Sequence, residues 1–370
     1  MTDPLPNPSR ATPLAPGFRP WWPAIDLVAV ATQWAARFAE QLAGQADGSG
    51  AKSDASPVTA ADLALQAFIG NSLAAIDGGV SLVGEESSAI FGATDEAAAR
   101  GDSALFRRTE KLASTIDSTL HGRALLEAID RGTADGRARE QWVVDPIDGT
   151  RGYLRGLQYC VCLAFIRDGV PIVGIAGCPR LGPNGMLIAA VRGVGVLQWQ
   201  LDALDAQPTM PRASNARSGT IVACESTGVS DRARERLRRI AETLGEPLIV
   251  RPMESQCKFA LVATGDADLA IRLASANPNG QRDMIWDYAG AVVFAEESGA
   301  RMTDCDGRPL RFGEGRSIAG TRGVLCSASW LHARTVDACR SVDRLFGVPV
   351  PQLEAATAAS LDSGASQRAE

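Results

Sequence analysis

The order of apolar segments predicts an α+β protein whose two halves follow different patterns. Between residues 24 and 200, two stretches with helical spacing come before a series of apolar segments of strand length. Beyond residue 220, strand-like and helix-like segments alternate, which is typical of a smaller α/β unit. A stretch containing Pro208 and Pro211 separates the two patterns. We therefore expect an α+β domain over 21–207, an α/β domain over 208–347, and disordered tails over 1–20 and 348–370.

Two helices are expected before the first sheet. Apolar residues recur at helical spacing from Ala24 to Leu42, and a second helix is expected to begin at Thr59. The run Thr59-Ala60-Ala61-Asp62 has the form of a capping box, in which an acid in the first turn bonds back to the residue that caps the helix. Taken locally, Asp62 is explained as a helix-capping acid.

Apolar runs and turn residues predict the strands. A short strand at 80–83 ends in Glu85 and Glu86, which by themselves read as a solvated turn. We expect the first sheet to be largely antiparallel, because turn residues join successive runs. Its further strands are expected at 159–166, 170–176, 186–191 and 195–199. In the second half we expect strands at 220–224, 248–251, 267–273 and 323–327, and helices at 231–244, 254–264 and 286–298.

Composition excludes several classes of protein. The net charge of −6 offers no basic excess to offset the phosphates of a nucleic acid, so no nucleic-acid partner is expected. No uncharged apolar run reaches the length that spans a membrane, and no signal peptide is visible, so we expect a cytoplasmic protein. The eight cysteines are expected to be reduced and buried. With two histidines, the chain is expected to use carboxylates for its chemistry.

The segment from Trp142 to Thr150 carries the strongest local pattern. Trp142-Val143-Val144 reads as the end of a buried strand, which Pro146 is expected to stop because it lacks an amide donor. Asp145 and Asp148 straddle the turn and can place two carboxylates in one small volume. Such a pair favours a hard divalent cation such as Mg²⁺, and the amides of Gly149 and Thr150 could bind a phosphate. The alternative is an Asx-type turn with solvated carboxylates.

Taken together, the separate acids resemble a known family pattern. Asp62, then Glu85-Glu86, then Asp145-Pro146-Ile147-Asp148-Gly149-Thr150, then Trp286-Asp287 occur in the order found in the lithium-sensitive, Mg²⁺-dependent phosphomonoesterases that include inositol monophosphatases and fructose-1,6-bisphosphatases. The resemblance covers roughly residues 24–345. It implies a layered αβαβα sandwich and two or three Mg²⁺ ions.

Within that superfamily, the chain is most similar to the 3′(2′),5′-bisphosphate nucleotidases. The similarity is carried by Gly149-Thr150-Arg151-Gly152-Tyr153-Leu154-Arg155-Gly156-Leu157-Gln158-Tyr159 and by the segments 177–179, 253–259 and 265–272. It implies hydrolysis of the 3′-phosphate of adenosine 3′,5′-bisphosphate to AMP and phosphate. The implied partner is a small phosphorylated nucleotide, and the chain is expected to be a monomer or a homodimer.

The resemblance also implies roles for individual residues. Asp62 and Thr150 would orient and deprotonate the attacking water beside Glu85, and the amides of Gly149 and Thr150 would hold the scissile phosphate. The implied metal ligands are Glu85, Asp145, Asp148, Asp287 and the carbonyl of Ile147. The implied substrate contacts are Gly149, Thr150, Ser255, Lys258, Arg272 and Asp287. For Lys258 the alternative is a solvated lysine on a helix, and for Arg272 it is a surface arginine.

One position departs from the nucleotidase pattern. Glu225, in Ala223-Cys224-Glu225-Ser226-Thr227, stands near the place where those enzymes often have a substrate-contacting His. An acid beside a phosphate-bearing ligand puts the substrate in doubt, though not the metal chemistry. The nearest alternative is an inositol or sugar phosphate as substrate. Two further alternatives, independent of Glu225, are a non-catalytic protein that binds metal or nucleotide and a nucleic-acid phosphodiesterase, which the charge disfavours.

Overall fold

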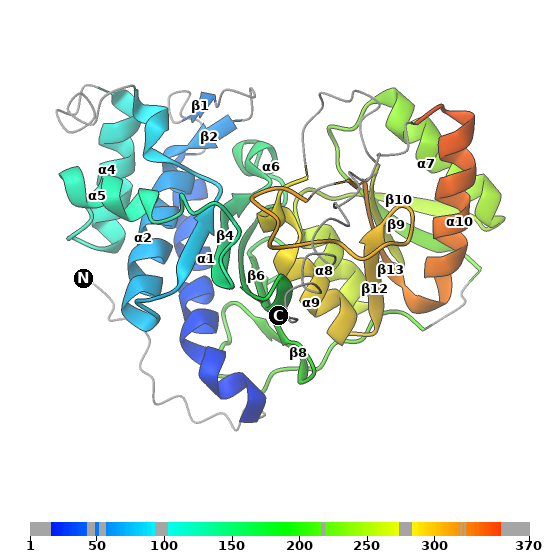
Figure 1. Cartoon of the computed structure of the whole chain (residues 1–370), viewed down its shortest axis with the longest axis horizontal. Helices are drawn as coiled ribbons and strands as arrows, with labels where there is room; N and C mark the ends of the chain where they lie inside the picture. The colour runs from blue at the N-terminus through cyan, green and yellow to red at the C-terminus, as the bar shows by residue number, and fades with distance from the viewer. Residues whose placement is uncertain are drawn as a thin grey trace, which may run out of the picture.

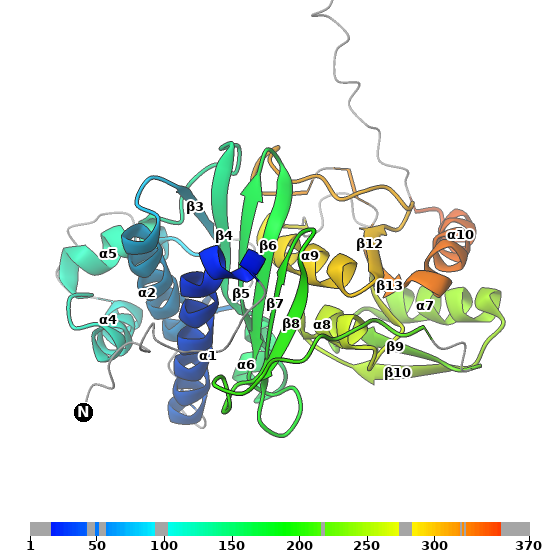
Figure 2. The same cartoon turned by 90° about the horizontal axis from the view of Figure 1, so that it is seen from below.

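The chain forms five layers, in which helices cover both faces of two β-sheets. The computed structural model describes residues 16–42, 49–51, 57–92, 103–215, 219–273, 283–318, 320–321 and 323–348. Figure 1 shows the two sheets with their helices, and Figure 2 shows the layers edge-on in the order helices, sheet, helices, sheet, helices. The expected αβαβα sandwich is confirmed. Residues 1–15 and 349–370, which hold most of the expected tails, lie outside the described residues.

The first sheet has six strands in the order β3-β4-β5-β6-β7-β8. They are β3 (Ser81–Gly84), β4 (Glu140–Asp148), β5 (Cys160–Arg167), β6 (Val170–Cys178), β7 (Met186–Val191) and β8 (Gly195–Gln200). Only β3 and β4 are parallel and the other neighbours are antiparallel, as the turn residues predict. Helices α1 (Trp22–Leu42) and α2 (Ala60–Ile76) cover one face of the sheet (Figure 2). α4 (Ala104–Ile116) and α5 (Gly122–Asp130) pack on α2 from outside.

Strand β4 runs through Pro146 instead of stopping there. Asp145 pairs with Cys162 and Asp148 pairs with Cys160, so three steps along β4 face two steps along β5. This bulge takes up the one extra residue and leaves Pro146 outside the regular ladder. The expectation that the strand ends before Pro146 is therefore wrong, and the bulge turns both aspartates toward the end of the strand.

The second sheet has five strands in the order β10-β9-β11-β13-β12. They are β9 (Ile221–Glu225), β10 (Leu248–Pro252), β11 (Leu269–Leu273), β12 (Ala300–Asp304) and β13 (Gly323–Ala328). α8 (Cys257–Thr264) and α9 (Ala289–Glu297) lie between the two sheets, while α7 (Asp231–Leu244) and α10 (Ser329–Leu345) cover the outer face (Figure 2). The division into two domains at 207/208 stays a prediction, because the middle helices pack against both sheets.

Several element boundaries differ from the sequence expectations. The helix expected at 254–264 begins at Cys257, because Ser255 has a left-handed φ of 63°. The helix expected at 286–298 is a 3-10 turn, η3 (Ile285–Asp287), followed after Tyr288 by α9. Strand β12 and helix α10 were not predicted at all. Residues 16–20, assigned above to a disordered arm, form most of a 3-10 helix, η1 (Pro16–Trp21), whose Phe18 is buried.

The three apolar cores follow the alternation of side chains along the strands. On β4, Trp142 and Val144 pack toward α1 and α2, while Val143 packs toward the middle helices. All eight cysteines are buried and free, as expected. Within the described ranges, no helix is long and apolar enough to cross a membrane.

Candidate active site

Three aspartates converge at the end of β4. Asp145 and Asp148 come from the bulged end of the strand, and Asp287 comes from η3, which precedes the middle helix α9. Each of the three aspartates contributes one carboxylate oxygen to a group whose members all lie within 4.8 Å of one another. Asp145 is buried, whereas Asp148 and Asp287 are partly exposed, so the cluster opens to solvent on one side.

Burial and mutual repulsion make this cluster unfavourable when it is fully ionised. Burial first, and then the charges of Glu85, Asp148 and Asp287, raise the pKa of Asp145 well above its usual range. Burial also raises the pKa of Asp148, and Lys258 opposes that rise. The pKa of Asp287 is raised to about 6, chiefly by burial and against the pull of Arg272. A divalent cation relieves such repulsion, and carboxylate oxygens are the ligands that Mg²⁺ prefers, so the residues present fit that ion.

Glu85 follows β3 and is held beside the aspartates by its backbone. Its amide donates to the carbonyl of Val144 at 3.2 Å, and its charge acts on both Asp145 and Asp287. The next residue, Glu86, is clamped by buried Gln66 of α2. Gln66 Nε2 donates to the Glu86 carbonyl at 2.7 Å, and the Glu86 amide donates to Gln66 Oε1 at 2.8 Å. The turn that carries Glu85 is therefore fixed and not a freely solvated one.

Asp62 and Thr150 meet across the fold. Thr150 Oγ1 lies 3.3 Å from Asp62 Oδ1 and 3.1 Å from the carbonyl of Ile147. Asp62 also caps α2, because its Oδ2 accepts from the Thr59 amide at 2.8 Å and from the Thr59 hydroxyl at 2.5 Å. The capping box expected from the sequence is confirmed. One oxygen of Asp62 thus completes the cap while the other faces Thr150.

Gly149 makes the turn into the short helix α6 (Thr150–Leu154). Its φ is 88°, and a Cβ placed there would lie 2.9 Å from the Cβ of Ser255, so both the backbone angle and the close neighbour require glycine. Asp145 Oδ1 accepts from the Ile147 amide at 3.1 Å, which is an Asx-type turn. Here the Asx turn and the convergence of acids coexist, whereas local sequence presents them as alternatives.

The segment before α8 closes the other side of the cluster. The Gln256 amide donates to Asp148 Oδ2, and Gln256 Nε2 donates to the carbonyl of Trp286 at 2.9 Å. Lys258 is buried, donates to Ser226 Oγ at 3.2 Å, and lowers the pKa of Asp148 through its charge. Lys258 is therefore not a solvated surface lysine. It links the loop after β9 to the acidic cluster.

Arg272 lies at the same site but is already engaged. Its Nη1 donates to Asp283 Oδ1 and to Tyr288 Oη, and it lies 3.8 Å from Asp287 Oδ2. Tyr288 Oη in turn donates to Asp283 Oδ1 at 2.7 Å. The Arg272 side chain keeps 31% of its surface exposed. It is not a plain surface arginine.

Sequence reasoning missed the residues that support these groups. Gln66 could have been noticed as a polar residue on the apolar face of α2. Arg316 donates to the carbonyls of Gly132, Ala134 and Gly84 and stacks over Trp286 at 4.8 Å from the ring centroid. No local pattern marks Arg316, because its partners lie more than 180 residues away along the chain. Trp286 is a core residue, as expected.

Glu225 ends β9 at the rim of the second sheet. Its carbonyl accepts from the Met253 amide at 2.8 Å. Burial raises the pKa of its carboxyl group, against the opposing charge of Arg234. Glu225 also lines a cavity of about 600 Å³ between α7 and the edge strand β10, together with Arg234 and Leu248. Glu225, the acid that departs from the nucleotidase pattern, is thus partly buried. It directly precedes Ser226, the partner of Lys258.

Comparison with known proteins places this architecture among the metal-dependent phosphatases. The profile of the inositol monophosphatase family matches residues 23–342. A 3′(2′),5′-bisphosphate nucleotidase from Schizosaccharomyces pombe is 31% identical over 337 residues, covering 86% of this chain and 94% of the relative. Another from Dictyostelium discoideum is 28% identical, covering 78% and 87%.

Solved structures share the fold at lower identity. The extragenic suppressor protein suhB from Bartonella henselae has a TM-score of 0.59 and 18% identity, covering 86% of this chain and 98% of its own. CysQ from Bacteroides thetaiotaomicron, a bacterial member of the inositol monophosphatase family, has a TM-score of 0.54 and 20% identity, covering 83% and 96%.

The chain belongs to the inositol monophosphatase family. It is therefore a phosphomonoesterase of that family, acting on a phosphorylated small molecule, and the family generally depends on Mg²⁺.

Proposed function

We propose that this protein is a 3′(2′),5′-bisphosphate nucleotidase that hydrolyses the 3′-phosphate of adenosine 3′,5′-bisphosphate, giving AMP and phosphate. The observation that carries the proposal is the Asp62–Thr150 pair beside three converging aspartates. A protein that only bound metal or nucleotide would need the aspartates but not a buried hydroxyl–carboxylate pair next to them. The names of the relatives supply the substrate class.

In this proposal Asp62 acts as the general base through Thr150. The two donors from Thr59 hold Asp62 Oδ2, and Oδ1 is the oxygen that faces the Thr150 hydroxyl and would receive its proton. The hydroxyl can donate to Asp62 while its lone pair accepts from a water molecule. The water proton then passes to Thr150 as the Thr150 proton passes to Asp62, and the hydroxide oxygen attacks phosphorus. No covalent enzyme intermediate is required.

The proposed ligands of Mg²⁺ are the carboxylates at the end of β4 and their neighbours. They are Glu85, Asp145, Asp148, Asp287 and the carbonyl of Ile147. When bound, Mg²⁺ supplies positive charge that activates water and stabilises the leaving oxygen. The resemblance implies two or three ions. Lys258 and the Gln256 amide hold Asp148 in place from the side of α8.

The proposed phosphate contacts lie on the other side of the same turn. The amides of Gly149 and Thr150 would hold the scissile phosphate, and Ser255 lies against Gly149. Lys258 and Arg272 are the cations that would contact the nucleotide and its second phosphate, and their charges act on Asp148 and Asp287, respectively, of the acidic centre. Because Arg272 is paired with Asp283, it would keep its orientation when a ligand binds.

A substrate panel tests this proposal. Phosphate release would be measured with Mg²⁺ and with EDTA on adenosine 3′,5′-bisphosphate, inositol 1-phosphate, inositol 1,4-bisphosphate, fructose 1,6-bisphosphate and 5′-AMP. The proposal expects strong preference for the first compound, lost with EDTA. Preference for an inositol or sugar phosphate would overturn the substrate and keep the metal chemistry. Absence of turnover on every compound would overturn the catalytic proposal.

A further inference from the structure

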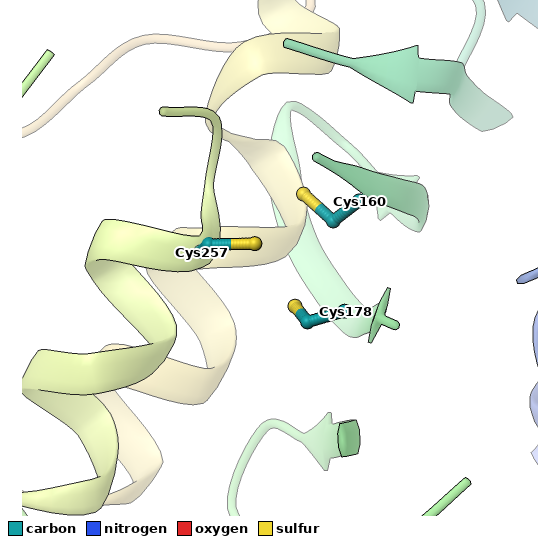
Figure 3. A group of neighbouring side chains, drawn as sticks. All are labelled: Cys160, Cys178 and Cys257. Atoms are coloured by element: carbon teal, nitrogen blue, oxygen red, sulfur yellow. The ribbon is translucent and has the colours of Figure 1, made fainter. Parts of the chain in front are cut away.

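Four buried cysteines lie directly beside the acidic centre. Cys160 and Cys162 stand on β5, Cys178 ends β6, and Cys257 begins α8. Figure 3 shows the sulfurs of Cys160, Cys178 and Cys257 turned toward a common space from these three elements. Their Sγ atoms all lie within 4.8 Å of one another. Cys160 also donates to Asp148 Oδ2 at 3.5 Å, and its sulfur lies 3.3 Å from that of Cys162.

The fold brings these thiols together from distant parts of the chain. In the β5–β6 pair, Val161 faces Gly177, so the neighbouring residues Cys160 and Cys178 come opposite each other on one face of the sheet. The left-handed backbone at Ser255 then starts α8 at Cys257, against that face. Cys257 donates to the carbonyl of Tyr159, which precedes Cys160. The three sulfurs are thus fixed by backbone elements.

We propose that Cys160, Cys178 and Cys257 form a binding site for a soft divalent cation of the Zn²⁺ and Cd²⁺ class, and that Asp148, which neighbours Cys160 but is not grouped with the other two sulfurs, moves to become the fourth ligand. In a tetrahedral zinc site with Zn–S bonds of about 2.3 Å, neighbouring sulfurs lie about 3.8 Å apart, and a sulfur and a carboxylate oxygen about 3.5 Å apart. The Cys160–Asp148 distance already has that value. The sulfurs need to close by about 1 Å or less. On binding, the thiol protons leave to solvent and the thiolates ligate the cation.

Ligand chemistry separates this site from the proposed Mg²⁺ site. Thiolates select soft cations, whereas Mg²⁺ takes oxygen ligands, so the two ions do not compete for the sulfurs. They do compete for Asp148, which borders both groups. A soft cation on the cysteines therefore draws Asp148 away from the acidic centre and inhibits any Mg²⁺-dependent reaction there.

The remaining cysteines provide a matched control. Within the part of the chain that the structure describes, Cys224, Cys305, Cys326 and Cys339 belong to no such group of three ligands. Cys326 is as fully buried as Cys160 and Cys178. Replacing Cys326 by alanine thus removes one buried thiol without touching the cluster, while Cys178→Ala and Cys257→Ala each remove one proposed ligand.

The test is a Cd²⁺ titration of the full chain without Mg²⁺, followed by the ultraviolet sulfur-to-cadmium charge-transfer absorption. We expect one Cd²⁺ per chain in the wild type and in Cys326→Ala. Affinity should fall at least about tenfold in Cys178→Ala and Cys257→Ala, in the range seen when a partner of a metal ligand is lost. A wild type without this absorption would overturn the proposal, and so would unchanged absorption in both cluster variants. The wild-type spectrum still tests the proposal even if one of the variants fails to fold.

A second arm measures inhibition of phosphate release by Cd²⁺ at saturating Mg²⁺. The cluster variants should need at least about tenfold more Cd²⁺ than Cys326→Ala for the same inhibition. Equal sensitivity of all the proteins would mean that Cd²⁺ acts on the carboxylates alone, and would overturn the proposal. The absorption readout does not depend on which substrate the enzyme uses.

Discussion

The hydroxyl oxygen of Thr150 lies 3.3 Å from Asp62 Oδ1, although 88 residues separate the two in sequence. Asp62 lies in the first turn of α2, outside the first sheet, and Thr150 begins α6 after the bulged end of β4. The pair joins the helical layer to the acidic centre. Neither residue looks catalytic by itself, because one caps a helix and the other begins one.

Removing the Thr150 hydroxyl should nearly abolish turnover. Thr150→Val keeps the branched shape but breaks the path by which Asp62 receives a proton. Positioned general bases contribute about 10²- to 10⁴-fold, so we expect a fall in kcat of that size with little change in Mg²⁺ affinity. Steady-state phosphate release over a Mg²⁺ titration measures both quantities. The matched control is Thr335→Val, a buried threonine on α10 that bonds only within its helix. Similar activity in the two variants would contradict the role given to Thr150.

Gln66 should be essential for the turn that presents Glu85. In Gln66→Leu the amide and carbonyl of Glu86 lose their partner, and the carbonyl of Ile129 loses a bond of 2.9 Å. Buried groups left unsatisfied cost about 1–3 kcal/mol each, so we expect a loss of about 3 kcal/mol in the free energy of unfolding. Mg²⁺ affinity should fall as well, because Glu85 is displaced.

Urea unfolding with and without Mg²⁺ measures both effects of Gln66→Leu. The exposed Gln33 on α1 gives the control, Gln33→Leu, which should change neither quantity. Wild-type Mg²⁺ affinity in Gln66→Leu would show that the clamp does not position Glu85.

Mg²⁺ should stabilise the protein more at neutral than at acidic pH. The folded-state pKa values of Asp145, Asp148 and Asp287 are raised, so without metal these groups favour folding below their unfolded values. This stabilising contribution to folding is lost as the pH rises from the unfolded-state pKa to the folded-state pKa. For Asp287 that window runs from pH 3.8 to about 6. Ionised carboxylates are also what the cation needs. The rise in Tm on adding Mg²⁺ should therefore be small at about pH 5 and large at about pH 8.

Thermal unfolding with EDTA or excess Mg²⁺ across this range tests the linkage. Asp287→Asn should flatten the pH dependence of the metal-free protein, because it removes one of the raised groups. A Mg²⁺ effect that does not depend on pH would be inconsistent with ligation by these aspartates.

Glu225 should weaken the binding of a substrate with a second phosphate. Its carboxyl group lines the cavity beside α7 together with Arg234, and the next residue along the chain is Ser226, the partner of Lys258. If the second phosphate binds there, Glu225→Gln removes repulsion and should lower KM for adenosine 3′,5′-bisphosphate about 5- to 10-fold, or roughly 1 kcal/mol. Binding of inositol 1-phosphate, which carries no second phosphate, should stay the same, measured as a KM or an inhibition constant. An equal effect on mono- and bisphosphates would place the second phosphate elsewhere.

The convergence of Asp145 and Asp148 could be predicted locally, because the two residues straddle one turn, whereas their role as metal ligands stays a prediction. The local sequence around Asp62 and Glu85 does not indicate a shared site. Only the order of these acids along the chain, compared with the family pattern, pointed to it. The bulge at Pro146 could not be foreseen, because it depends on the register with Cys160 and Cys162 of the next strand.

The thiol cluster could not be predicted from the sequence either, because it also depends on contacts between distant elements. Cys178 and Cys257 meet only when β6 and α8 pack together, and nothing in their local sequence links them. Ser255 likewise looked like part of a continuous helix, since no local pattern marks the left-handed φ that delays α8. Periodicity predicts elements, whereas these features arise from packing between them.

The most direct test is phosphate release by Asp145→Asn compared with the wild type over a Mg²⁺ titration. The asparagine Oδ1 can still accept from the Ile147 amide, so the turn and the fold should survive, as thermal unfolding would show. We expect Mg²⁺-dependent turnover in the wild type, and a fall of at least about a hundredfold in the variant from the loss of several kcal/mol of metal-dependent stabilisation. Near-wild-type activity in folded Asp145→Asn would contradict the assignment of the acidic centre as the catalytic metal site.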